Sequence, residues 1–292
     1  MTKKNTKANI ISSLWWQSLE RGGTLFVQFL IQLILARLLT PRDYGIIAFI
    51  TIFTTIGNVF VQSGFSTALI QRKDVTDIDF SSVFYLNLFI AILMYVLLFF
   101  SAPIIANFYN EPQITLVLRV LSIALFFGAV ISIQNAVVAR ELQFHKLFFS
   151  SLGAIVISGV IGVFMSYKGY GVWALVGQQL SYKGFLCILM FITVRWRPKI
   201  LFSYTRVRSL FSYGWKLLLA SLIDTVYKDL RSLIIGKVST PEMLGYYNRG
   251  QQFPSVIVTI VNSSIQSVML PTYSKQQDNT SRIKDMMRRS IL

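Results

Sequence analysis

The sequence predicts an all-α integral membrane protein of about eight transmembrane helices. Of its 292 residues, 54% are hydrophobic and only 14% are charged, whereas an average soluble domain has about 25% charged residues. Apolar runs of about 20 residues, the length that crosses a bilayer as a helix, recur along the chain. Basic residues lie mainly between these runs. This pattern leaves no room for a sizeable soluble domain.

The first apolar run resembles a signal peptide only superficially. It continues to about Leu38 and contains glutamine and charged side chains, so we interpret it as the first membrane helix. Seven further apolar runs follow it. The expected spans are Ile10–Leu38, Tyr44–Ser66, Ser82–Ile105, Ile114–Val137, Leu147–Tyr167, Val172–Val194, Phe211–Gly236 and Leu244–Leu270.

The distribution of Lys and Arg predicts that the N-terminus lies in the cytoplasm. In that orientation the inner segments hold 17 basic residues and the outer connections hold 4. Cytoplasmic segments of membrane proteins carry such an excess of Lys and Arg. The formal net charge of +16 therefore reflects membrane topology. A nucleic-acid-binding protein would instead gather its basic residues on a folded polar surface.

Polar side chains recur at helical spacing in three of the expected spans. A single polar side chain in such a helix usually hydrogen-bonds a neighbouring helix. Three continuous stripes favour a shared water-filled cavity, because a polar stripe facing lipid costs free energy. The stripes are Gln17, Arg21, Thr24, Gln28 and Gln32 in the first span, Thr51, Thr55, Asn58 and Gln62 in the second, and Asn248, Gln252, Ser255, Thr259, Asn262 and Gln266 in the eighth.

Charged side chains also lie within the expected spans. A cation at the bilayer centre costs about 3 kcal/mol or more unless it faces water, a counter-ion or a substrate. Most of these charges are basic, which favours an anionic substrate such as a pyrophosphate. Arg119, Lys216 and Arg249 lie near helix ends and can equally extend to lipid headgroups. The candidate substrate-binding residues are Arg21, Lys183, Lys228, Arg231, Arg119, Lys216 and Arg249, with Glu20 and Asp224 as counter-ions, and the candidate cavity stripe is Gln17, Gln28, Asn58, Gln62, Gln252 and Asn262.

The sequence contains no motif for catalysis or for a cofactor. It has no nucleotide-binding loop, no zinc-type spacing and no serine-nucleophile elbow. The single cysteine, Cys187, lies inside an apolar run and is interpreted as a packing residue. The acidic cluster Asp74, Asp77 and Asp79 is interpreted as a solvated turn and helix cap. We therefore expect neither an enzyme nor a bound metal or cofactor.

An internal repeat relates two segments 200 residues apart, Leu33–Gly45 and Leu233–Gly245. Each contains the pattern Thr-Pro-x-x-x-Gly, in which Thr can cap a helix and Pro suits its first turn. An even number of spans separates the two copies, which predicts parallel repeats related by an axis along the membrane normal. We expect residues 1–200 to form a six-helix bundle and 201–292 to supply the first two helices of a second, incomplete bundle. A C-terminal truncation or a split gene would explain this shortfall.

Five short stretches carry a family resemblance: Ala36–Gly45, Arg140–Phe144, Tyr170–Val176, Leu244–Asn248 and Leu270–Ser274. In this order they resemble the Wzx-like flippases, which form the polysaccharide transporter branch of the multidrug/oligosaccharidyl-lipid/polysaccharide exporter superfamily. The resemblance extends from about Leu14 to Lys275. It implies a MATE-like fold, in which two six-helix bundles enclose a central cavity, in a bacterial cytoplasmic membrane.

The resemblance also implies a function. Such proteins move undecaprenyl-pyrophosphate-linked oligosaccharides across the membrane by alternating access, for lipopolysaccharide or capsule synthesis, with coupling to an ion gradient or the membrane potential. The implied partners are the lipid-linked oligosaccharide and membrane lipids, and the resemblance allows a polysaccharide polymerase and glycosyltransferases, but no nucleic acid. Two alternatives stay open at this point: a drug or metabolite exporter of the same superfamily, and a non-transporting remnant or assembly partner from a split gene.

Overall fold

The computed structural model describes residues 3–62, 64–71, 75–251, 254 and 258, and these residues form helices without strands. The chain divides into a compact unit, Met1–Asn248, and a second unit that begins at Arg249. The arrangement below concerns the first unit. Its helices are α1 (Lys3–Leu38), α2 (Pro41–Gln62), α3 (Phe65–Gln71), α4 (Asp77–Tyr109), α5 (Gln113–Leu121), α6 (Ala124–Glu141), α7 (Phe144–Tyr167), α8 (Val172–Thr193) and α9 (Tyr204–Val238).

Six segments of the described chain are long and apolar enough to cross a membrane, which confirms an all-α, multi-pass membrane protein. They coincide with the first six predicted spans. The seventh predicted span lies within α9, a helix of 35 residues whose charged side chains lower its hydropathy. The eighth falls mostly outside the described residues, so the total of eight stays a prediction, as does the division at residue 200. The six segments are Trp15–Leu38, Pro41–Ile70, Asp77–Tyr109, Gln113–Glu141, Phe144–Tyr167 and Val172–Thr193.

Two of these spans are broken helices, which hydropathy did not predict. The second span changes from α2 to α3 near Gly64, whose φ of 67° is readily adopted by glycine but disfavoured for other residues. The fourth span changes from α5 to α6 after Ser122, whose hydroxyl donates to the carbonyl oxygen of Leu118 at 2.7 Å. A serine hydroxyl bonded to the preceding turn favours a bend in a helix. Each break interrupts the helix for only one or two residues, so hydropathy averaged over a whole span does not reveal it.

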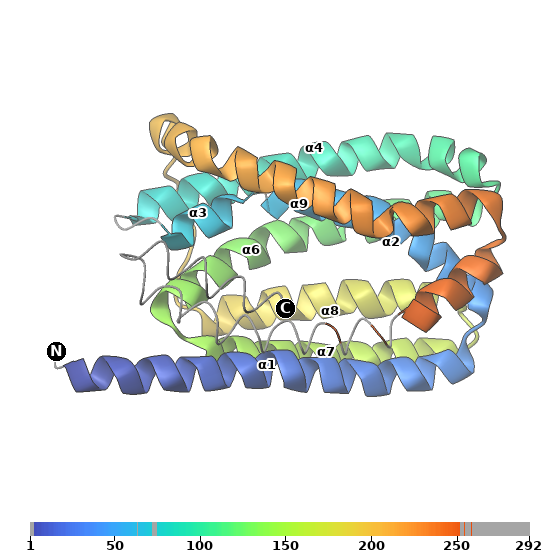
Figure 1. Cartoon of the computed structure of the whole chain (residues 1–292), viewed down its shortest axis with the longest axis horizontal. Helices are drawn as coiled ribbons and strands as arrows, with labels where there is room; N and C mark the ends of the chain where they lie inside the picture. The colour runs from blue at the N-terminus through green and yellow to red at the C-terminus, as the bar shows by residue number, and fades with distance from the viewer. Residues whose placement is uncertain (1–2, 63, 72–74, 252–253, 255–257, 259–292) are drawn as a thin grey trace, which may run out of the picture. The chain divides into compact units, whose positions relative to one another are not determined.

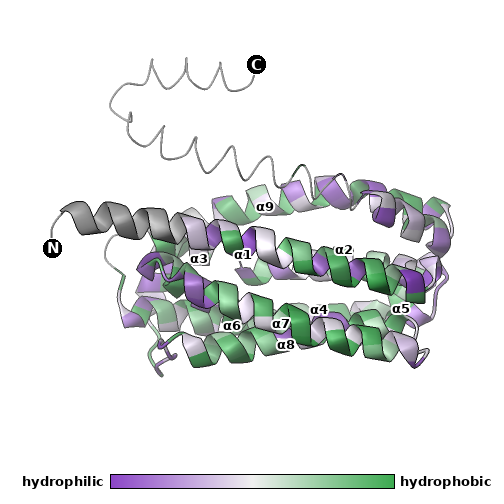
Figure 2. Ribbon diagram, turned by 90° about the horizontal axis from the view of Figure 1, so that it is seen from below, coloured by the Kyte–Doolittle hydropathy of each residue, from purple (hydrophilic) through white to green (hydrophobic). Residues whose placement is uncertain are grey.

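The helices pack in two groups that share contacts through α6 and α8. Helix α1 lies along α7, and α7 lies along α8 (Figure 1). Helix α4 packs against α5 and α6, and α9 lies across α2 and α4. Glycine permits close approaches between these helices, because a Cβ at Gly159 of α7 would collide with Ile31 and a Cβ at Gly162 would press on Gln178. Helix α9 alternates between hydrophobic and hydrophilic residues (Figure 2).

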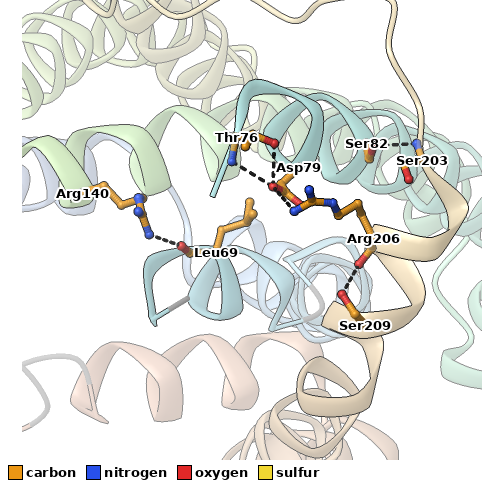
Figure 3. A network of polar contacts seen from close by, with 8 residues as sticks. All are labelled: Leu69, Thr76, Asp79, Ser82, Arg140, Ser203, Arg206 and Ser209. Carbon is orange, nitrogen blue, oxygen red and sulfur yellow. Dashed lines mark hydrogen bonds and ion pairs between the residues drawn. The ribbon is translucent and has the colours of Figure 1, made fainter. Parts of the chain in front are cut away.

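Polar contacts fix the segment between α8 and α9 to the start of α4, at the end of the bundle predicted to be cytoplasmic (Figure 3). The buried Asp79 carboxylate accepts hydrogen bonds from the backbone N–H and the hydroxyl of Thr76, both at 2.9 Å. It also forms an ion pair with Arg206 at 3.3 Å. Next to this pair, the backbone N–H of Ser203 donates to the Ser82 hydroxyl at 2.9 Å. Asp79 therefore helps to cap α4, as predicted, but it is buried and paired with Arg206, so the prediction of a solvated position was wrong for this residue. Asp77 is partly exposed, and Asp74 lies outside the described residues.

The two copies of the internal repeat contact each other at the predicted outer end. Helices α1 and α9 both end two residues before their Thr-Pro pair, and a new helix begins at each proline. A Cβ added at Gly45 would collide with the carbonyl oxygen of Pro241, and one added at Gly245 would collide with that of Pro41. A two-fold axis between the copies produces this reciprocal pattern. The glycines of the repeat thus allow backbone-to-backbone packing.

Candidate functional site

Two cavities meet at the middle of α8. The inner cavity, of about 380 Å³, lies among α2, α3, α6, α8 and the start of α7, and extends towards the predicted cytoplasmic end. The α1–α8 cavity, of about 250 Å³, lies between α1, α7 and α8. Tyr182 and Lys183 line both cavities. These adjacent residues therefore connect the two spaces.

Lys183 is the charged side chain at this junction. It lies halfway along α8 and is partly buried. Its ammonium donates one long hydrogen bond, of 3.4 Å, to Oδ1 of Asn58 on α2. Within the described part of the chain, no carboxylate lies within ion-pairing distance of it. A cation at this depth requires water or an anion, and the two cavities give either access to it.

The polar stripes predicted on the first and second spans reach the same place. Gln28 and Gln32 of α1 line the α1–α8 cavity. On α2, Asn58 holds Lys183 and Gln62 lines the inner cavity. Gln17 lies nearer the start of α1 and lines neither cavity. The structure thus brings parts of the two stripes together around one lysine.

Other predicted residues lie elsewhere on α1. Arg21 is exposed on α1, and Glu20 is half-buried with the Ser151 hydroxyl of α7 as a hydrogen-bond partner. Neither residue lines the inner cavity or the α1–α8 cavity. Glu20 therefore contributes to the contact between α1 and α7, whereas Arg21 remains accessible.

The predicted charges on α9 form an exposed group. Asp224 and Lys228 make an ion pair of 2.6 Å, in which the side chains are 58% and 68% exposed. A pair this exposed contributes little to stability, about 0.5 kcal/mol. Arg231 and Lys216 are exposed on the same helix. None of these four residues lines either cavity.

The last predicted cation, Arg119, points at α4. Its Nε donates to the carbonyl oxygen of Phe99 at 3.2 Å, and its guanidinium lies 4.1 Å from the centre of the Phe99 ring. These contacts explain a basic residue at this position without a substrate. Arg249 is the first residue of the second unit. Gln252 and Asn262 lie outside the described residues.

Sequence reasoning missed most of the inner cavity wall. Helix periodicity drew attention to long polar side chains, whereas the wall also contains short polar side chains from α3 and α6. One signal was present, because Phe144 belongs to a family-like stretch and lies at the cavity. The missed lining residues are Ser66, Thr67, Ser132, Asn135 and Tyr182.

Comparison with known proteins identifies related sequences. A family model described as "Polysaccharide biosynthesis protein" matches residues 34–292. The chain is 26% identical over 281 residues to the teichuronic acid biosynthesis protein TuaB of Bacillus subtilis, covering 94% of this chain and 58% of that protein. It is 23% identical over 282 residues to the succinoglycan biosynthesis transport protein ExoT of Rhizobium meliloti, covering 97% and 57% of the two chains.

A third relative is the lipopolysaccharide biosynthesis protein WzxC of Escherichia coli, with 21% identity over 276 residues, or 94% of this chain and 56% of WzxC. The chain thus spans less than two thirds of the length of these relatives. No solved structure matches it.

Proposed function

Because the chain belongs to the polysaccharide biosynthesis protein family, we propose that it acts in a flippase for a lipid-linked oligosaccharide used in surface polysaccharide synthesis. The names of its relatives refer to teichuronic acid, succinoglycan transport and lipopolysaccharide. The observation that carries the proposal is Lys183, a cation halfway along a membrane-spanning helix that borders two cavities. Its expected ligand is the pyrophosphate of an undecaprenyl-linked glycan.

Anion binding at Lys183 follows from its surroundings. The ammonium has one long hydrogen bond to Asn58 and, among the described residues, no acidic partner, so it retains donors for a phosphate oxygen. Lysine binds phosphate as a point charge, and a low-dielectric setting strengthens that attraction. Arg21, Lys228 and Arg231 are proposed as further cations that the substrate meets along its path. The lipid tail remains in the bilayer.

The proposed transport cycle uses the repeat contact. With the N-terminus in the cytoplasm, the inner cavity receives the headgroup from the cytoplasmic side. In this inward-open state the outer ends of the repeats are closed by the packing of Gly45 on Pro241 and of Gly245 on Pro41. Rocking of the repeats about each other then exposes the headgroup to the outside. A polymerase and glycosyltransferases are proposed as protein partners that consume and supply this substrate.

Replacement of Lys183 by glutamine tests the function in the host bacterium. Removing a charged hydrogen-bonding group costs about 2 kcal/mol, so we expect surface polysaccharide to fall by roughly tenfold or more and lipid-linked precursor to accumulate. Lys183→Arg should retain part of the export because the charge remains. The amounts of surface polymer and of membrane-extracted precursor are the measurements.

The matched control is Ser181→Ala on the same helix. The Ser181 hydroxyl donates to the carbonyl oxygen of Gly177 at 2.6 Å and lines neither cavity, so export should stay normal. The amount of each variant in the membrane is measured by immunoblot. Normal export with Lys183→Gln at normal protein level would refute the assignment of Lys183 to the substrate.

A further inference from the structure

The inner cavity has a wall rich in neutral hydrogen-bonding groups. Helix α3 contributes Ser66 and Thr67, and α6 contributes Ser132 and Asn135. These residues belong to segments that cross the membrane. Hydroxyl and amide groups at such positions face protein, water or a ligand, because facing lipid would cost free energy. The side of α6 that meets α3 therefore presents polar groups to the inner cavity.

Two contacts hold α3 and α6 together as one wall. The hydroxyls of Ser66 and Ser132 share a hydrogen bond of 2.5 Å. At the far end of α3, Nη1 of Arg140 donates to the carbonyl oxygen of Leu69 at 2.7 Å (Figure 3). The wall is thus fixed at two points, and Ser66 and Ser132 already satisfy each other. A rigid wall can orient a ligand at low entropic cost.

Thr67 and Asn135 are the groups of this wall that remain available. Both side chains are exposed, and neither has a hydrogen-bond partner among the described residues. An asparagine amide offers two donors and an acceptor with two lone pairs, and a threonine hydroxyl offers a donor and two lone pairs. Neither residue carries a charge. Their expected ligand is therefore a neutral, hydroxyl-rich group.

Aromatic side chains complete the surface. Phe144 lies at the predicted cytoplasmic end of the cavity, and Tyr182 lies beside Lys183. A sugar ring has apolar C–H faces that pack on aromatic rings and hydroxyls that bond amides and hydroxyls. The cavity volume of about 380 Å³ lies at the lower end of the range for small-ligand sites, which suits one or two sugar units better than a long glycan.

We infer that the α3–α6 wall is a sugar subsite, in which Thr67 and Asn135 bind the sugar next to the pyrophosphate while Lys183 binds the pyrophosphate. This inference rests on the proposed function and adds to it the part of the glycan that is recognised. Lys183 lines the same cavity as Thr67 and Asn135, which brings a phosphate site and a hydroxyl-binding site together. The identity of the first sugar should therefore affect binding.

The test compares two kinds of lipid probe. The purified chain in lipid nanodiscs is titrated with a bare polyprenyl pyrophosphate and with the same lipid carrying one glucose, galactose or N-acetylglucosamine. We expect at least one glycolipid to bind about tenfold more tightly than the bare lipid, the gain of one or two good hydrogen bonds. The double variant Thr67→Val/Asn135→Leu, which keeps side-chain shape, should lose this gain and bind the bare lipid normally.

Two control variants separate the possible failures. Ser181→Ala should bind every probe like the wild type, and Lys183→Gln should bind every probe more weakly. Failure of the wild type to bind the bare lipid would refute the proposed function. If the wild type binds the bare lipid and every glycolipid with equal affinity, the sugar subsite alone is refuted. The same holds if the folded double variant still binds a glycolipid more tightly than the bare lipid. Thermal unfolding of each variant in the same nanodiscs measures folding.

Discussion

Replacement of Gly45 by alanine is expected to lower the free energy of unfolding by about 2 kcal/mol, the usual effect of overpacking. The added Cβ would collide with the carbonyl oxygen of Pro241, a backbone atom that cannot turn away as a flexible side chain can. Because the contact is reciprocal, Gly245→Ala, which meets the Pro41 carbonyl, should have a similar effect. Thermal unfolding of the purified protein in detergent is the measurement.

Gly22→Ala on α1 is the matched control for this prediction. An added Cβ at Gly22 meets nothing within 4 Å, and alanine favours a helix over glycine by about 1 kcal/mol. This variant should be as stable as the wild type or slightly more stable. Unchanged stability in both Gly45→Ala and Gly245→Ala would show that the two repeats do not pack as closely as described.

Replacement of Asp79 by asparagine is expected to destabilise the protein by about 2 kcal/mol, because the buried carboxylate loses charge-assisted hydrogen bonds and its ion pair with the partly exposed Arg206. The Asp79 side chain is completely buried and bonds both the start of α4 and Arg206. Without the Asp79 charge, the Arg206 guanidinium loses its counter-ion, so the attachment of the start of α9 to the start of α4 weakens. Chemical or thermal unfolding in detergent measures the loss.

Asp77→Asn serves as the control because Asp77 lies two residues away in the same helix. Its ion pair with Lys199 is close, at 2.6 Å, but the two side chains are 49% and 59% exposed, respectively. Exposed pairs contribute roughly 0–1 kcal/mol, so this variant should unfold almost like the wild type. If Asp79→Asn and Asp77→Asn lower the free energy of unfolding equally, burial of Asp79 does not determine how much this residue contributes to stability.

The spans could be predicted from the sequence because hydropathy depends on composition alone. The six apolar spans match, and the repeat anticipated that the helices after α1 and α9 both begin at a Thr-Pro pair. The breaks near Gly64 and Ser122 could not be predicted in this way, because a short interruption of a helix leaves the average hydropathy unaltered. The eighth span falls mostly outside the described residues and stays a prediction.

The candidate site could be predicted only as faces of separate helices. Helical periodicity placed Gln28 and Gln32 on one face of α1, and the structure adds that this face lies opposite Lys183 of α8. The sequence could not show which cation lies beside the polar stripes, because this depends on tertiary packing. Arg119, like Lys183, is a basic residue in an apolar span, but it stacks on Phe99. The short polar residues of α3 and α6 gave no periodic signal.

The charges of α9 have a consequence for biogenesis. Each charged residue near the centre of an isolated helix opposes insertion by about 3 kcal/mol, and Asp224, Lys228 and Arg231 are exposed on the helix surface. Alone, α9 would leave the translocon for the lipid phase inefficiently, unlike α4 or α7, whose apolar segments partition readily. If α9 crosses the membrane, as the sequence predicts, its insertion should therefore require earlier helices, and α2 and α4 are the long helices that contact it in the folded chain.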